Sequence, residues 1–172
     1  MSVKKILTEP NKLLRQVSSS IDKVGDEERA LMDDMLDTMY EAPGIGLAAV
    51  QIGVPKRIIV LDISRDENKK EPRYFVNPII KIKNEEKSTY EEGCLSVPDQ
   101  FAEIERPNSC EVEYLDYDGK KQILKAEGLL ATCIQHEMDH LEGILFIDYL
   151  SKLKKSMIIK KLSKIKLNRI IV

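Results

Sequence analysis

The chain contains only two histidines, and both lie in the segment His136-Glu137-Met138-Asp139-His140. Residues four positions apart lie on one face of an α-helix, so a helix here would turn both imidazoles to the same side. The flanking residues are mostly apolar: Leu129, Leu130, Cys133 and Ile134 before the segment, and Leu141, Ile144, Leu145, Phe146 and Ile147 after it. We therefore expect a buried central helix, in which two imidazoles and a carboxylate need polar partners.

The pattern of this segment, HExxH, is typical of metal-dependent hydrolases. Two histidines at this spacing can bind one cation, and Glu137 stands beside them to handle the proton of a metal-bound water. A helix face open to solvent could carry the same polar residues without any function, but the apolar flanks argue against that interpretation. The sequence predicts metal-assisted hydrolysis.

A catalytic metal site usually has three protein ligands and one open position, so a third ligand must come from elsewhere. No histidine follows His140, and Glu142 is the only glutamate after it. The third ligand is therefore expected upstream, and the candidates are Cys94, Cys110 and Cys133. Their odd number and unrelated spacings suit reduced thiols better than disulfides.

The three cysteines lie in different contexts. Cys110 falls in an alternating stretch that is typical of a strand, where a thiol commonly fills the core. Cys133 shares the expected helix with both histidines, and three ligands from one helix would enclose a metal poorly, so we interpret it as a pocket or core residue. Cys94 follows Gly93 and lies shortly before Pro98, a setting that can present a thiolate from a loop or a strand end.

A third segment, PGIGLAAVQIG at 43–53, contains a formal GxGxxA pattern. A dinucleotide fingerprint would need a strand before it, but residues 27–40 carry apolar side chains at helical spacing. Two interpretations remain: a turn that ends this helix, or a loop whose bare backbone lets a substrate approach closely. Gln51, polar among apolar neighbours, could donate its amide to a developing oxyanion.

The segments GIGLAAVQIG, EGCLSVP and QHEMDHLEG occur in that order and resemble the three motifs of the peptide deformylase family of bacterial type. The resemblance extends over nearly the whole chain. It implies that Cys94, His136 and His140 are the metal ligands and that Glu137 is the catalytic acid and base. It also implies an oxyanion site formed by Gln51 and the backbone amide of Leu95.

The resemblance further implies which residues bind the substrate. Gly46 is expected to hydrogen-bond the substrate. The other expected contacts are Gly44, Ile45, Glu92, Gly93, Leu129 and Cys133. Of these, Ile45, Leu129 and Cys133 are candidates for an apolar pocket for a methionine side chain, and core packing is the alternative role for each. At two positions, Thr132 and Phe101, the residue differs from the one that many relatives carry. These differences bear on the preference for the substrate side chain and on the contact with the peptide backbone.

The activity that the resemblance implies is hydrolysis of the N-formyl group from the initiator formyl-methionine of nascent polypeptides, with release of formate. A metal-bound hydroxide would attack the formyl carbon, with Glu137 as general acid and base. The Cys/His/His set accepts one divalent metal ion, either iron, zinc, nickel or cobalt. We expect Fe(II) in the cell, whereas a purified sample could hold zinc, nickel or cobalt.

Two other classes of protein share parts of this pattern. A conventional metallopeptidase would also carry HExxH, but the downstream ligand typical of such enzymes is missing. A protein that binds a metal or the ribosome without catalysis would not need Glu137 and Gln51 beside the ligands. Assays on formylated and unformylated peptides separate these classes.

The length of 172 residues and the hydrophobic content of 42% suit a single catalytic domain spanning 1–172. The first residues lack the apolar run of a signal peptide, and no window approaches the roughly 20 apolar residues of a membrane span. We therefore expect a cytoplasmic protein without a membrane partner.

Periodicity predicts a helix that starts after Ser18-Ser19-Ser20 or at Asp26. It also predicts strands at 57–63, 74–83, 111–117 and 121–125, and the motif helix at 127–141. Asp118-Gly119 is a hairpin signal between the last two strands. The expected fold class is α+β: antiparallel β-sheets packed around a central HExxH helix, with an N-terminal helical segment and a C-terminal helix.

The end of the chain is strongly basic. Residues 151–172 hold seven Lys and one Arg and no acidic residue, so the rest of the chain carries −10 against a net charge of −2. Apolar residues recur near helical spacing, which predicts a basic amphipathic helix at 150–168. These are Leu150, Leu153, Met157, Leu162 and Ile165. The apolar stripe could simply pack on the domain. The lysines could in addition contact RNA, since the resemblance implies that this helix docks on the ribosome.

Overall fold

The computed structural model describes residues 2–64 and 66–171, and the side chains as far as Lys164. Its larger sheet has five antiparallel strands in the order β1-β2-β3-β6-β7. The strands are β1 (Gly46–Ala48), β2 (Ile58–Leu61), β3 (Arg73–Lys83), β6 (Ser109–Leu115) and β7 (Lys121–Glu127). The four strands predicted from periodicity are confirmed, as is the hairpin at Asp118-Gly119, where Gly119 has a φ of 82°.

A turn at 42–43 ends the preceding helix, as one interpretation of the glycine segment predicted, and the Gly44 N–H donates to the Met39 carbonyl at 2.9 Å. The segment then forms regular structure that was not predicted, the short edge strand β1 followed by a 3-10 helix, η2 (Ala49–Ile52). Strand β1 pairs with β2, with Gly46 opposite Leu61 and Ala48 opposite Ile59. A three-residue strand that contains glycine carries too little alternation to be recognised from sequence.

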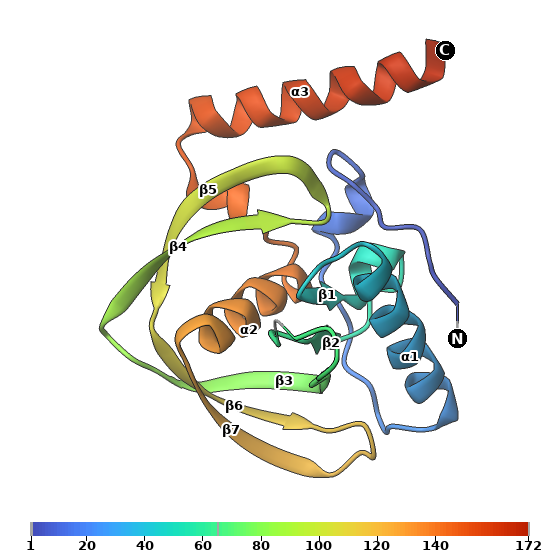
Figure 1. The fold of residues 1–172 in the computed structure, drawn as a ribbon, viewed down its shortest axis with the longest axis vertical. Coiled ribbons are helices and arrows are strands. Elements are labelled where there is room, and N and C mark those ends of the chain that lie inside the picture. The colour runs from blue at the N-terminus through green and yellow to red at the C-terminus, as the bar shows by residue number, and fades with distance from the viewer. Residues whose placement is uncertain (1, 65, 172) are drawn as a thin grey trace.

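Helix α1 (Asp26–Glu41) starts at the second of the two predicted positions. The Glu28 carboxylate accepts a hydrogen bond from the Gly25 backbone N–H at 2.9 Å, and acidic residues in the first turn suit the helix dipole. Its buried face carries Met32, Met35 and Met39, which pack against β1 and β2. The helix therefore covers the edge of the sheet that carries the glycine segment (Figure 1).

A second, two-stranded sheet was not predicted from sequence. It consists of β4 (Lys87–Cys94) and β5 (Val97–Pro107), which form the long curved hairpin in Figure 1. Its buried side chains are few, but Val97 and Ile104 pack with Phe146 and Leu162. The register shifts between Gly93 and Cys94, just before the turn.

Helix α2 (Gly128–Leu141) carries the HExxH segment and lies between the five-stranded sheet and the β4–β5 hairpin (Figure 1). It contacts β1, β2, β5, β6 and β7. Almost every residue from Ala131 to Glu137 is buried. The prediction of an α+β fold with antiparallel sheets around a central HExxH helix is confirmed.

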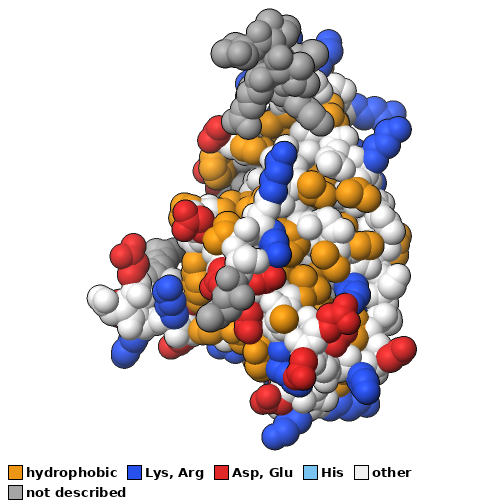
Figure 2. Space-filling view, turned by 90° about the vertical axis from the view of Figure 1, so that its right-hand side faces the viewer, with side chains coloured by type: hydrophobic (Ala, Val, Ile, Leu, Met, Phe, Trp, Pro, Cys, Tyr) orange, Lys and Arg blue, Asp and Glu red, His pale blue; other side chains and the backbone are white. Residues whose placement is uncertain are grey.

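The chain ends in α3 (Lys152–Ile171), which follows the short 3-10 helix η3 (Phe146–Tyr149) and lies across the hairpin (Figure 1). Leu162 is buried against the hairpin, whereas Leu153 and Met157 are exposed, so only part of the expected apolar stripe is packed. Ile165 lies outside the described side chains. On the face in Figure 2, acidic side chains lie mainly in the lower part, away from α3.

Within the described part of the chain, no helix combines the length and apolar character that a membrane crossing requires.

The N-terminal segment adds a further 3-10 helix, η1 (Lys12–Arg15). Arg15 of this element donates to the Gly143 carbonyl at 3.2 Å and to Asp148 at 2.6 Å. The N-terminal segment therefore fixes the chain that leaves α2.

We predict that Gly143→Ala destabilises the protein much more than Gly53→Ala. Both glycines have positive φ, 73° and 84°, so either alanine costs on the order of 1 kcal/mol in the backbone. A Cβ at Gly143 would also lie 2.4 Å from the Arg15 carbonyl oxygen, whereas one at Gly53 meets nothing within 4 Å. Urea unfolding measures the difference, which we expect to exceed roughly 2 kcal/mol. Equal losses would contradict this account of the α2 exit.

Candidate active site

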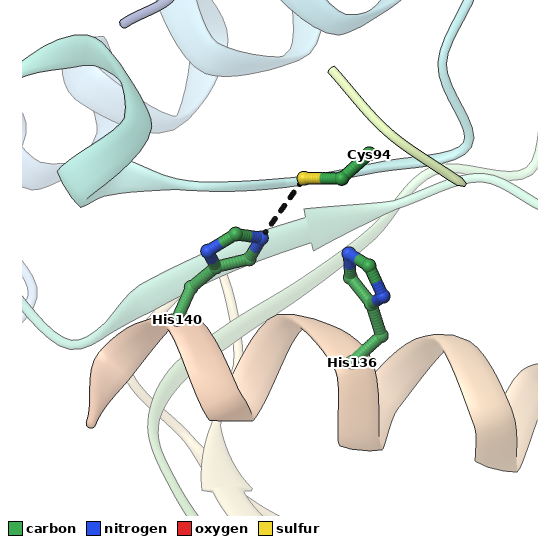
Figure 3. Close-up of side chains that lie close together, drawn as sticks. All are labelled: Cys94, His136 and His140. Carbon is green, nitrogen blue, oxygen red and sulfur yellow. Dashed lines mark hydrogen bonds between the residues drawn. The ribbon is translucent and has the colours of Figure 1, made fainter. Parts of the chain in front are cut away.

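Cys94, His136 and His140 come together at the centre of the fold. Cys94 ends β4, and both histidines project from one side of α2 towards it (Figure 3). Their ligand atoms lie within 4.8 Å of one another, and Cys94 Sγ is 3.3 Å from His140 Nε2. A thiol and two imidazoles at this separation could hold one metal ion.

The other two cysteines have different surroundings. Cys110 is buried in β6, where burial raises the pKa of its thiol. Cys133 is buried on α2, and burial, together with the charge of Glu137, raises the pKa of its thiol to about 12. Of the three cysteines in the described chain, only Cys94 lies within the cluster.

Glu92 fixes the orientation of the His136 ring. The Nδ1–H of His136 donates to a Glu92 carboxylate oxygen at 2.9 Å, which leaves Nε2 free to face Cys94. Burial alone would raise the pKa of Glu92, but the hydrogen bonds from His136 and Arg106 outweigh it and lower the pKa. Glu92 lines the pocket, as do all the expected substrate contacts, yet both of its oxygens accept hydrogen bonds from protein groups.

Arg106 on β5 holds this carboxylate in place, and sequence reasoning missed it. Its guanidinium donates to Glu92 at 2.7 and 3.0 Å and to Asp139 at 2.8 Å. The Tyr149 hydroxyl donates to the same Asp139 oxygen at 2.7 Å. Arg106 is buried, so the two carboxylates are its charge partners within the protein. The sequence did hold a signal for such a residue. Glu92 and Asp139 are acidic residues in motifs expected to be buried, and buried carboxylates need a cationic partner.

Glu137 differs from Glu92 because it has no such partners. Its Oε2 is buried and has no hydrogen-bond partner among the described residues. Burial, with a smaller contribution from the charge of Glu92, raises its pKa to about 7, and the opposing effect of His136 is weaker. A carboxyl group with a pKa near 7 can both accept and return a proton at neutral pH. Glycine is needed at Gly46, because a Cβ there would lie 2.6 Å from Glu137 Oε1.

Gln51 is held in one orientation by the residues beside it. Its side-chain oxygen accepts a hydrogen bond from the Ala48 N–H at 2.9 Å, which turns the amide nitrogen towards the cluster. That nitrogen donates to the Ser96 hydroxyl at 2.9 Å and lies 3.5 Å from Cys94 Sγ. Sequence reasoning missed Ser96, although it lies within the EGCLSVP segment, two residues after Cys94, and the structure shows it fully buried.

A pocket of about 620 Å³ opens over these groups. One wall comes from β1 and the residues before it, where Gly44 lies under the Leu95 side chain so closely that a Cβ would meet it at 2.6 Å. The opposite wall comes from β4 and β5, and the floor from α2, which contributes Leu129 and Cys133. Ile45 is half-exposed at the rim. His140 lies beneath the lining residues and is itself buried.

A cluster with metal-ligand spacing, a buried carboxylate with a pKa near 7 and an oriented amide at the base of one pocket define the centre of a metal-dependent hydrolase. Comparison with known proteins identifies the family. Residues 3–156 match the model of the polypeptide deformylase family. The chain belongs to this family.

The peptide deformylase of Pelagibacter ubique (strain HTCC1062) is 86% identical over the full length of both chains. That of Rhizobium meliloti (strain 1021) is 56% identical over 95% of this chain and 94% of its own. The crystal structure of the Ehrlichia chaffeensis peptide deformylase has a TM-score of 0.93 and 43% identity, covering 98% of this chain and 99% of that one. The chain is thus a peptide deformylase-type hydrolase, and the family's general function is metal-dependent removal of the N-formyl group from nascent peptides.

We predict that Arg106→Ala weakens metal binding by roughly tenfold to a hundredfold, because Glu92 then loses the partner that holds it against His136. Arg29→Ala is the matched control, since Arg29 pairs with the exposed Asp26 far from α2. Competition with a chelating dye, on protein shown by circular dichroism to be folded, measures the affinity for Zn²⁺ and Co²⁺. Equal affinities in the two variants would contradict a positioning role for Arg106.

Proposed function

We propose that Cys94, His136 and His140 hold one divalent cation at the base of this pocket, within a single catalytic domain formed by residues 1–172. The observation that carries the proposal is the buried carboxylate of Glu137, whose Oε2 has no hydrogen-bond partner among the described residues, beside a thiol and two imidazoles. The donor set suits iron, zinc, nickel or cobalt. We propose Fe(II) in the cell and one of the other three ions in a purified sample.

The bound ion would supply a nucleophile near neutral pH by lowering the pKa of a water molecule. Glu137 accepts the proton of that water and later delivers it to the departing amine nitrogen. Its pKa of about 7 suits both transfers. The products are formate and a free N-terminal amine.

Charge that develops on the formyl oxygen is met by the Gln51 amide and the Leu95 backbone N–H. A donor of this kind contributes on the order of 3 kcal/mol to transition-state stabilisation. The hydrogen bond from Ala48 fixes the direction of the Gln51 amide, so little reorganisation is needed when the charge appears.

The formylated peptide lies between β1 and β4, whose residues line opposite walls of the pocket. Gly46 hydrogen-bonds its backbone, while Gly44 and Gly93 line the pocket beneath the Leu95 and Phe101 side chains. Ile45, Leu129 and Cys133 surround the methionine side chain, and Glu92 contributes through His136. Among these, Leu129 and Cys133 come from α2, seven and three residues before His136, which supports a side-chain pocket close to the metal ligands.

We predict that Glu137→Gln lowers the release of formate from formyl-Met-Ala-Ser by about a hundredfold to ten-thousandfold, because the proton acceptor is lost. Glu142→Gln is the matched control: it lies just past the end of α2, where it pairs with Arg57 at 2.8 Å, and should retain nearly full activity. Both proteins are purified without oxygen, loaded with Fe(II) and checked for equal iron content. An active Glu137→Gln protein would refute the assignment of Glu137, and an inactive, iron-loaded native protein would refute deformylation.

We further propose that the protein acts in the cytoplasm, where α3 docks on the ribosome. Lys160 and Lys164 are exposed on α3, and neither lines a groove against the hairpin. Lysines on such a face can contact the phosphates of ribosomal RNA, with an affinity that falls steeply as salt rises.

We predict that Lys160→Glu with Lys164→Glu reduces co-sedimentation with ribosomes at low salt by at least about tenfold, since each change replaces a phosphate contact with a repulsion. Lys23→Glu is the control, because Lys23 is exposed before α1. Turnover of a short formyl-peptide should be unchanged in both variants. Ribosome binding that survives the double substitution would contradict the docking face.

A further inference from the structure

A groove of about 490 Å³ runs between β5 and α3, outside the pocket described above. Its main lining residues are Phe101, Leu150, Lys154, Met157, Ile158 and Lys161. Lys154, Met157, Ile158 and Lys161 follow the spacing of one helix face, and the buried Leu162 holds α3 against the hairpin. The groove is therefore formed by a fixed face of the helix.

Phe101 joins the groove to the active-site pocket, because it lines both. Its ring lies over Gly93, the residue before Cys94: a Cβ at Gly93 would come 2.6 Å from two ring carbons. The side chain is nevertheless 66% exposed. The Phe101 ring thus lies between the pocket and the groove, and its exposed face is available to a peptide that passes from the pocket into the groove.

The chemistry of the groove suits a particular kind of chain. Phe101, Met157 and Ile158 give it an apolar surface, and Met157 is 52% exposed. Lys154 and Lys161 lie along the same helix face, both exposed, and outnumber the one acidic residue of the lining, Glu103 on β5. Lys155 does not contribute, since it pairs with Asp148 at 2.7 Å. The complementary ligand is an extended peptide that carries apolar and acidic side chains.

We propose that this groove binds the part of the nascent chain that follows the formylated residue, and prefers apolar and acidic residues there. The inference rests on the proposed function, because it places the formylated end in the adjoining pocket. A nascent substrate is long, so its chain must leave the pocket, and the shared Phe101 offers a continuous apolar surface along the way. Contacts so far from the reacting bond act equally on ground and transition states, so they lower KM and leave kcat unchanged.

The test compares formyl-Met-Ala-Ser with two longer peptides that begin in the same way. An extended chain advances about 3.3 Å per residue, so a ten-residue peptide is roughly 33 Å long. One peptide has a tail of Leu and Glu, and the other has a tail of Ser and Lys. We expect KM for the Leu/Glu peptide to be about tenfold below that of the tripeptide, with equal kcat, and no gain for the Ser/Lys peptide.

Three variants locate the effect. Met157→Asp and Lys161→Glu should each remove most of the advantage of the Leu/Glu tail while leaving the tripeptide unchanged. Lys160→Glu makes the same charge change one residue away, outside the groove, and should keep the advantage. A tail advantage that survives both groove variants, or one that Lys160→Glu removes equally, would overturn the proposal.

Two further measurements separate the alternatives. Fluorescence anisotropy of a labelled Leu/Glu tail without formylmethionine tests the groove even if no peptide is hydrolysed; binding that Lys161→Glu weakens would support the groove while the proposed function fails. Sedimentation tests the other occupant, a second copy of the chain. A dimer that Met157→Asp separates would assign the groove to that copy and overturn the peptide proposal.

Discussion

The buried ion pairs of Arg106 with Glu92 and Asp139 are the interaction on which the geometry of the site depends. Glu92 comes from β4, Arg106 from β5 and Asp139 from α2, so the pairs join the hairpin to the central helix. Cys94 and His136 belong to these same elements, and their separation follows from the junction. Removing Arg106 would leave the buried Glu92 without its charge partner, which typically costs about 3–5 kcal/mol.

The same junction explains how a hairpin with few apolar residues is stable. A two-stranded sheet alone is marginal in water. Here the hairpin is anchored at one point by Arg106 and elsewhere by Val97 and Ile104, which pack against Phe146 and Leu162. The hairpin therefore depends on the helices at both of its contacts, and it carries Cys94, Leu95 and Phe101 together.

The sequence predicted what is local and periodic. Helix α2 was placed to within a residue because its apolar flanks and HExxH spacing are contiguous, and the strands of the large sheet alternate clearly. Strands β4 and β5 were missed because exposed charged residues dominate them. Cys94 was found through its motif, but Arg106, Ser96 and Tyr149 were not. Their partners lie far along the chain, and the pairing depends on the hairpin register, which Gly93 shifts by a bulge.

The hydrogen bonds distinguish two kinds of side chain in the site: those held in one orientation by protein partners, and one that has a polar atom without a partner among the described residues. Glu92, Arg106 and Gln51 have their polar atoms matched by protein partners, so each has one orientation. Glu137, at the same depth, has a buried oxygen without a partner among the described residues, and burial holds its pKa near 7. A satisfied carboxylate such as Glu92 could not exchange protons at neutral pH, because its partners lower its pKa. Two glutamates on adjoining elements thus differ in pKa because Arg106 and His136 satisfy Glu92, whereas one oxygen of Glu137 has no hydrogen-bond partner among the described residues.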